Sequence, residues 1–151
     1  MRAVNSALLF CIGDKPMTWL ELKNIIKTLG FEENSILTEY QEIIINACNL
    51  SVSTINDIVV SRLQGYFKSQ DKDWVKPEIT PFTAETADDF ELEMPKLVHK
   101  LVPYLAAYHV WLDDDERKAI YYYNMYQDMK DELIGEYTRA MKATIVGGYD
   151  I

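Results

Sequence analysis

Four consecutive acidic side chains form the group in this sequence that comes closest to a metal-binding pattern: Asp113, Asp114, Asp115 and Glu116. Carboxylate oxygens are the ligands that Ca²⁺ and Mg²⁺ prefer. An EF-hand loop beginning at Asp113 would need glycine at its sixth position, where this sequence has Lys118. The simpler interpretation is that Asp113 and Asp115 cap the N-terminus of a helix, where the helix dipole also favours negative charge. We therefore expect helix caps at this acidic corner and no metal site.

The histidines and cysteines do not form a site either. His99 and His109 are ten residues apart, about 280° around a helix, so they do not share a face. Cys11 and Cys48 are too few and too far apart for a disulfide framework or a zinc site, and they fit a reducing compartment. The sequence contains no P-loop, G-x-S-x-G, H-E-x-x-H or C-x-x-C motif. We expect no catalytic residue, no cofactor and no enzymatic activity; a nuclease using Mg²⁺ at the acidic corner is the weaker alternative.

Tyrosine is concentrated in one part of the chain. Of the ten tyrosines, seven lie between Tyr104 and Tyr137. Such rings can stack on nucleic-acid bases, but that use requires many interleaved basic residues, and few occur here. Burial in the core or in a subunit interface is the better interpretation. Tyr122 and Tyr126 are the candidate interface residues of this cluster.

Composition and charge bound the possible functions. The 151 residues fit one domain, and 48% hydrophobic with 26% charged residues is ordinary for a globular protein. The formal charge is −9, from 15 basic and 24 acidic residues. A free-standing nucleic-acid binder needs clustered Lys and Arg, so this surface would repel DNA on average. No stretch approaches the roughly 18 apolar residues of a membrane span, so we expect no membrane partner.

The first half of the chain predicts helices. Thr18 and Glu21 form a capping-box pattern, and Gly30 is a natural helix stop. A second helix should start near Asn34 and break at 51–54, where hydroxyl and β-branched side chains are poor helix formers. Helical spacing then resumes up to Gly65. One side of the second helix should carry Ile36, Tyr40, Ile43, Ala47 and Leu50. Residues 1–16 are expected to be an N-terminal extension.

Residues 68–94 should form an extended acidic arm. Pro77 and Pro81 exclude a regular helix, and no Lys or Arg occurs between Lys76 and Lys96. Near its end, Phe90, Leu92 and Met94 alternate with glutamates in the two-residue period of a half-buried strand. These three residues are the candidate contacts to a neighbouring chain, which the arm could join by strand addition. A surface loop that folds back on its own bundle is the alternative.

The C-terminal third predicts a helical hairpin. Residues Pro95–Leu112 and Glu116–Arg139 should be antiparallel, and Pro103 should kink the first helix or restart it. The expected contacts between the two helices are Leu101, Leu105, Tyr108, Tyr122, Tyr126 and Met129. The predicted fold is therefore mainly α, a small helical bundle with a C-terminal helical hairpin and an extended, partly β central arm. It should occupy residues 17–141, followed by a flexible tail over 142–151.

Three segments, in this order, resemble the head–tail adaptor (connector) proteins of long-tailed bacteriophages. The first is MTWLELK at 17–23, with LGFEE at 29–33 and INACN at 45–49. The second is TADDFELE at 86–93. The third and most specific is LVPYLAAY at 101–108, with WLDDDERKA at 111–119 and YYN at 122–124. Relatives often carry a larger β-rich insert in the middle, where this chain has only about 64–88.

The resemblance implies a structural role in the virion. Such a protein is made in the host cytoplasm and forms a ring of about twelve copies beneath the portal, at the neck between head and tail. It extends the DNA channel, contacts the portal protein and a downstream neck or tail-completion protein, and lets DNA pass without sequence-specific binding. The alternative is a non-catalytic helical binding or regulatory module of a phage or prophage, acting as a small oligomer.

Overall fold

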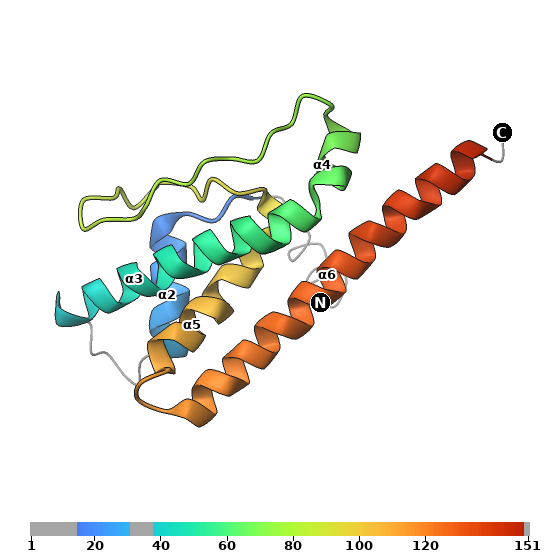
Figure 1. Ribbon diagram of the computed structural model, residues 1–151. Coiled ribbons are helices and arrows are strands. Elements are labelled where there is room, and N and C mark those ends of the chain that lie inside the picture. The colour runs from blue at the N-terminus through green and yellow to red at the C-terminus, as the bar shows by residue number, and fades with distance from the viewer. Residues whose placement is uncertain (1–14, 31–37, 150–151) are drawn as a thin grey trace, which may run out of the picture.

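The computed structural model describes residues 15–30 and 38–149, with side chains over 15–30 and 40–141 (Figure 1). Its helical elements are α2 (Trp19–Gly30), α3 (Thr38–Ile55), the π-helical segment η1 (Asn56–Val60), α4 (Gln64–Gln70), the 3₁₀ helix η2 (Lys96–Leu101), α5 (Val102–Trp111) and α6 (Glu116–Tyr149). Between α4 and η2 the chain is extended and runs beside α3 (Figure 1). The prediction of a mainly helical bundle is confirmed.

Helix α5 lies at the centre of the bundle, and α2, α3 and α6 all pack against it (Figure 1). A helix that is apolar on all sides is expected to be covered by its neighbours. The small side chains of Ala106 and Ala107 are fully buried, which allows the surrounding helices to approach closely. The buried residues of α5 are Val102, Pro103, Leu105, Ala106, Ala107 and Val110.

The end of α2 is fixed by its contact with α5. A Cβ atom at Gly30 would lie 3.1 Å from Cγ1 of Val110, so glycine allows a close approach of the two helices here. The indole Nε1 of Trp111 donates a hydrogen bond to the backbone oxygen of Leu29 at 2.8 Å. This bond satisfies one of the carbonyl groups that a helix C-terminus leaves unpaired.

The predicted helical hairpin is present. Its second helix is α6, and its first is η2 followed by α5, so that Pro103 lies in the first turn of a restarted helix. Of the expected contacts, Leu101, Leu105 and Tyr126 are buried. Tyr108 and Met129 are partly buried at the edge of the core, where the rings of Tyr108 and Tyr123 lie 4.9 Å apart, and Tyr122 is half-buried.

Helix α3 differs from the prediction in two ways. It does not break at 51–54, because the Ser51 hydroxyl donates to the backbone oxygen of Ala47 at 2.7 Å and so finds its partner within the helix. The irregularity comes later, in the π-helical segment η1. Of the residues expected on one side of this helix, Ala47 is buried, whereas Ile43 and Leu50 are exposed. The buried face of α3 consists of Ile44, Ala47, Cys48, Ser51, Val52 and Ile55.

The prediction of a partly β arm is wrong for the described residues. The arm contains no strand, and its one β-type pairing is an isolated bridge between Thr18 and Glu91. The two-residue period remains visible in burial, since Leu92 and Met94 are buried. The partner of this segment is the start of α2, which offers only a few backbone groups and cannot form a ladder.

The structure describes most of the predicted C-terminal tail and little of the predicted N-terminal extension. Helix α6 continues to Tyr149, so residues 142–149 of the expected tail are helical, and the flexibility of the tail stays a prediction. Most of the predicted N-terminal extension, 1–14, lies outside the described residues, as do Asn34 and Ile36.

Replacing Tyr126 with alanine tests the hairpin core. Tyr126 is 2% exposed, so Tyr126→Ala should lower the free energy of unfolding by about 3 kcal/mol. Tyr121 is 59% exposed on the same helix, so Tyr121→Ala should change it by less than about 0.5 kcal/mol. Chemical denaturation of both variants makes the comparison, and equal losses would show that Tyr126 is not a core residue.

Candidate interaction surfaces

The N-terminus of α2 is closed by a side-chain cap and by the arm. The hydroxyl of Thr18 accepts a hydrogen bond from the backbone N–H of Glu21 at 3.2 Å, and Oε1 of Glu21 accepts one from the backbone N–H of Thr18 at 3.1 Å. This reciprocal pair is the predicted capping box. The next two N–H groups, of Trp19 and Leu20, donate to backbone oxygens of the arm at 2.7 and 3.0 Å. All of these N–H groups would otherwise lack a partner.

The acidic corner connects α5 to α6 and caps the second of these helices. Oδ1 of Asp115 accepts a hydrogen bond from the backbone N–H of Lys118 at 3.2 Å. Asp113 is exposed in the turn and makes no hydrogen bond to another described residue, so the cap of α6 is Asp115 and not Asp113. Within the described part of the chain, no three His, Cys, Asp or Glu side chains are grouped to hold a metal ion.

The outgoing limb of the arm (71–83) is attached to α2 and α3. The ring of Phe82 stacks on the indole of Trp19, with centroids 4.1 Å apart and planes at 10°. The Asn49 side chain holds the backbone of Phe82 on both sides: Oδ1 accepts from its N–H at 2.8 Å, and Nδ2 donates to its oxygen at 3.1 Å. Farther along α3, Nδ2 of Asn56 donates to the backbone oxygen of Pro77 at 3.1 Å.

The returning limb (84–95) is attached to the start of α2. The backbone N–H of Leu92 donates to the oxygen of Met17 at 2.9 Å, and Lys23 forms an ion pair with Asp88 at 2.9 Å. The two limbs are also joined to each other. The carboxylate of Glu93 accepts from the backbone N–H of Thr80 at 2.6 Å and from its hydroxyl at 3.1 Å.

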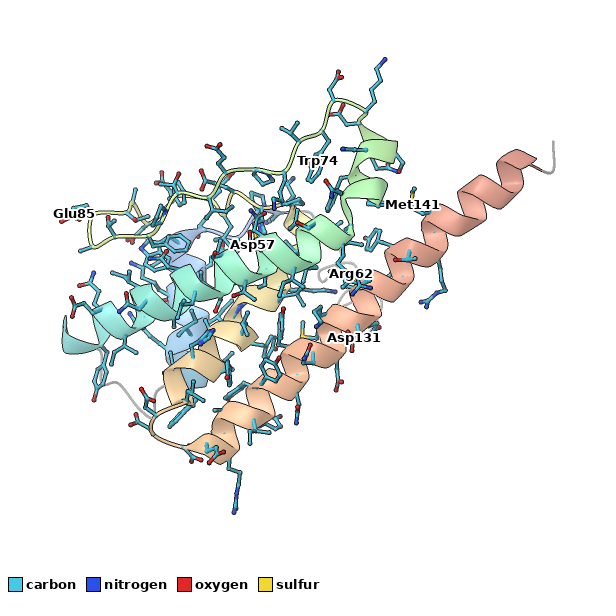
Figure 2. The ribbon with its side chains drawn as sticks, viewed as in Figure 1. Asp57, Arg62, Trp74, Glu85, Asp131 and Met141 are labelled. Carbon is cyan, nitrogen blue, oxygen red and sulfur yellow. The ribbon has the colours of Figure 1, made fainter. Side chains whose placement is uncertain are left out.

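The arm therefore folds back on its own bundle, as the alternative interpretation of the sequence expects. Leu92 and Met94 are 5% and 3% exposed, and the half-buried Phe90 meets the ring of Phe82 edge-on at 6.0 Å. In this conformation their side chains belong to the core of their own chain. Contact of these residues with a neighbouring chain stays a prediction. Figure 2 shows Glu85 at the outer end of the arm, where the side chain is exposed.

Of the two candidate tyrosines, Tyr126 belongs to the core of its own chain, and Tyr122 is half-buried. The ring of Tyr122 lies 6.5 Å from that of Tyr104 across the hairpin. Burial raises the pKa of both phenols, so each remains protonated at neutral pH. Their participation in a subunit interface stays a prediction.

His99 connects the segment before α2 with the end of the arm, although no pattern in the sequence indicates this. The backbone N–H of Met17 donates to Nδ1 at 3.0 Å. Nδ1 must then be unprotonated, so Nε2 carries the proton and donates to the backbone oxygen of Met94 at 2.7 Å. Burial lowers the pKa of His99, since a neutral ring is favoured in this site.

An exposed apolar line on α3 and η1 is the clearest unpartnered surface among the described residues. It consists of Ile43, Leu50 and Ile58, which are 44%, 55% and 47% exposed, and we call it the α3 ridge. In a regular helix, eight steps along the chain place the side chains of Leu50 and Ile58 about 80° apart around the helix axis. The wider turn of η1 reduces this offset, because a π-helix has more residues per turn. Helix α3 is apolar on more than one side, so its sequence pattern does not distinguish the ridge from the buried face.

The same helix bears on the expectation of no membrane-spanning segment. Tyr40–Val60, with 21 residues, is the one described helix long and apolar enough to cross a membrane by length and composition. The sequence-based expectation that no such stretch exists is therefore wrong. Half of its most apolar window (50%) is buried inside the bundle, which favours a core helix.

No protein-family model, no curated protein and no solved structure matches this chain.

Asn49 provides a test of how the arm is held. Asn49→Ala removes both partners of the Phe82 backbone, so we expect the free energy of unfolding to fall by about 2 kcal/mol. Hydrogen exchange of the Phe82 amide should become much faster. Asn46 is exposed one turn earlier on α3, so Asn46→Ala should change neither quantity appreciably. Identical behaviour of the two variants would contradict this attachment.

His99 predicts how stability depends on pH. Because burial holds its pKa below the unfolded value of 6.5, the unfolded chain binds this proton first as the pH falls. Stability should therefore decrease below pH 6.5, by at most about 1.4 kcal/mol per pH unit for one proton, until the folded protein also binds it. The pKa of His109 is also lowered by burial and contributes in the same direction.

Denaturation of the wild type, His99→Gln and His109→Gln between pH 5 and pH 8 separates the two histidines. Glutamine can still donate and accept hydrogen bonds but does not titrate. The free energy of unfolding of the wild type, relative to that of His99→Gln, should fall as the pH falls below 6.5. A constant difference over this range would exclude His99 as a source of the pH dependence.

Proposed function

We propose that this protein is a non-catalytic virion component, a head–tail adaptor whose copies form a ring beneath the portal of a long-tailed phage. The observation that carries the proposal is the ordered resemblance of three sequence segments to such adaptors. The most specific of them, over 101–124, folds as α5, the acidic corner and the first turns of α6. A small helical bundle is also the fold that the resemblance implies.

The surface of the molecule supports an assembly role. The α3 ridge is apolar and exposed, which is a typical property of a protein–protein contact. The arm carries exposed carboxylates, among them Glu78, Glu85 and Asp89. No Lys or Arg occurs in the sequence between Lys76 and Lys96. A surface of this charge repels DNA, which suits a channel through which DNA moves without binding.

Purified phage particles provide the test. We expect mass spectrometry to find the protein in virions at about a dozen copies, and electron microscopy to place a ring of it between portal and tail. A small oligomer in the lysate together with absence from particles would support the alternative, a helical binding or regulatory module. That result would exclude the adaptor function.

A further inference from the structure

We propose that His99 is a proton-sensitive latch, which holds the returning limb of the arm (84–95) on the start of α2 and releases it when the imidazole ring is protonated. The release takes place within a single chain, so it goes beyond the proposed ring and does not depend on it. Two hydrogen bonds of the ring and the backbone bonds beside them define the latch.

The ring of His99 has a partner of fixed polarity at each nitrogen. Nε2 donates to the backbone oxygen of Met94 at 2.7 Å, and this bond can persist when the ring gains a proton. Nδ1 accepts from the backbone N–H of Met17 at 3.0 Å. An imidazolium ring carries an N–H at both nitrogens, so the N–H of Met17 would then face a second donor. The protonated ring therefore excludes Met17 from its present position.

Met17 is bound to the returning limb as well as to the ring. Its backbone oxygen accepts a hydrogen bond from the N–H of Leu92 at 2.9 Å. Two residues farther along the chain, the N–H of Trp19 donates to the backbone oxygen of Phe90 at 2.7 Å. A displacement of Met17 therefore acts first on the bond to Leu92 and then on the bonds that follow it along α2.

The outgoing limb (71–83) has attachments that do not involve His99. The ring of Phe82 stacks on Trp19, and Asn49 binds the backbone of Phe82 through both polar atoms of its amide. The oxygen of Pro77 accepts from the side chain of Asn56. Protonation of His99 therefore releases one limb of the arm and leaves the other in place, which distinguishes the latch from general unfolding.

Release of the returning limb uncovers apolar side chains. Leu92 is 5% exposed in the docked limb, and Phe90 is half-buried beside Phe82. Both are among the residues that the sequence indicates as contacts to a neighbouring chain. In the docked conformation they belong to the core of their own chain, so the latch determines the pH below which they become available to a partner.

Burial and two charged groups set the pH at which the latch opens. Burial is the largest influence on the pKa of His99 and lowers it, whereas the hydrogen bond to Met94 raises it. Charge faces the ring from the arm, where Glu91 raises the pKa, and from η2, where Lys96 lowers it. A released, hydrated ring regains its ordinary pKa of 6.5. The docked limb is thus fully stable above pH 6.5 and loses stability as the pH falls below it.

Hydrogen exchange of single amides tests the release. The N–H groups of Trp19, Leu20 and Leu92 are all bonded across the contact between the arm and the start of α2, so their exchange reports whether the limb is docked. Relative to the unfolded chain at the same pH, the protection of Leu92 should fall by up to about tenfold for each pH unit below 6.5. The protection of Phe82, which Asn49 holds, should stay nearly constant. Equal losses at Leu92 and Phe82, or constant protection of Leu92, would overturn the latch.

Two exposed charges provide matched variants. Glu91→Gln should move the loss of Leu92 protection to lower pH, and Lys96→Gln should move it to higher pH, because the two side chains act on His99 with opposite sign. His109→Gln, at a half-buried histidine of α5, should leave the transition where it is. Shifts of Glu91→Gln and Lys96→Gln in the same direction, or a transition that disappears in His109→Gln, would contradict the role of His99.

Nitrogen NMR of the His99 ring in the wild-type chain gives a reading that needs no variant. Near neutral pH the ring should carry its proton on Nε2, and its protonation at lower pH should coincide with the loss of Leu92 protection. A proton on Nδ1 of the neutral ring would overturn the latch. So would a ring that becomes protonated while Leu92 remains protected.

Discussion

The stacking of Phe82 on Trp19 is the contact on which the non-helical part of the molecule depends. Trp19 is only 2% exposed because the arm covers its indole, and Nζ of Lys23 lies 5.3 Å from the same ring. Ordering more than twenty residues without secondary structure has a large entropic cost. Burial of Phe82, Leu92 and Met94 offsets part of that cost, and the backbone bonds to α2 and Asn49 offset more. Without the ring contact, the outgoing limb would lose the apolar surface against which Phe82 is held.

The two C-terminal helices of the bundle differ greatly in length. Helix α5 has 10 residues and is covered on all sides, whereas α6 has 34 and buries one face through Ala119, Tyr126, Leu133 and Ile134. At 1.5 Å per residue, α6 is about 36 Å longer than α5. The remaining elements cover only part of this excess, with α4 reaching as far as Met141. The extension of α6 therefore follows from the unequal lengths of the two helices.

Local signals in the sequence were sufficient for the elements that are determined locally. The capping pair Thr18 and Glu21, the restart at Pro103 and the hairpin around the acidic corner all follow from short-range chemistry. The buried face of α3 did not follow, because Ile43, Ile44 and Ile45 offer apolar side chains in three directions. Only the position of α5 decides that Ile44 is buried and Ile43 exposed.

The arm shows the same limit. Alternation of Leu92 and Met94 with glutamates predicted one buried side correctly, but a strand also needs a partner strand, and nothing local supplies one. The attachment of Phe82 to Asn49 joins residues 33 positions apart, and that of Met17 to His99 joins residues 82 apart. Neither asparagine nor histidine in a sequence indicates such a distant partner, since both residue types are ordinary on helices.

The central position of α5 also has a consequence for the order of events during synthesis. Helices α2 and α3 both pack on α5, whose last residue is Trp111 of a chain of 151. A ribosome must therefore release the chain through Trp111 before the first two helices have their common neighbour. Until then Leu22, Ile26 and Ile55, all fully buried in the finished fold, remain open to water or to chaperones. The nascent chain therefore cannot complete its core until α5 has been released.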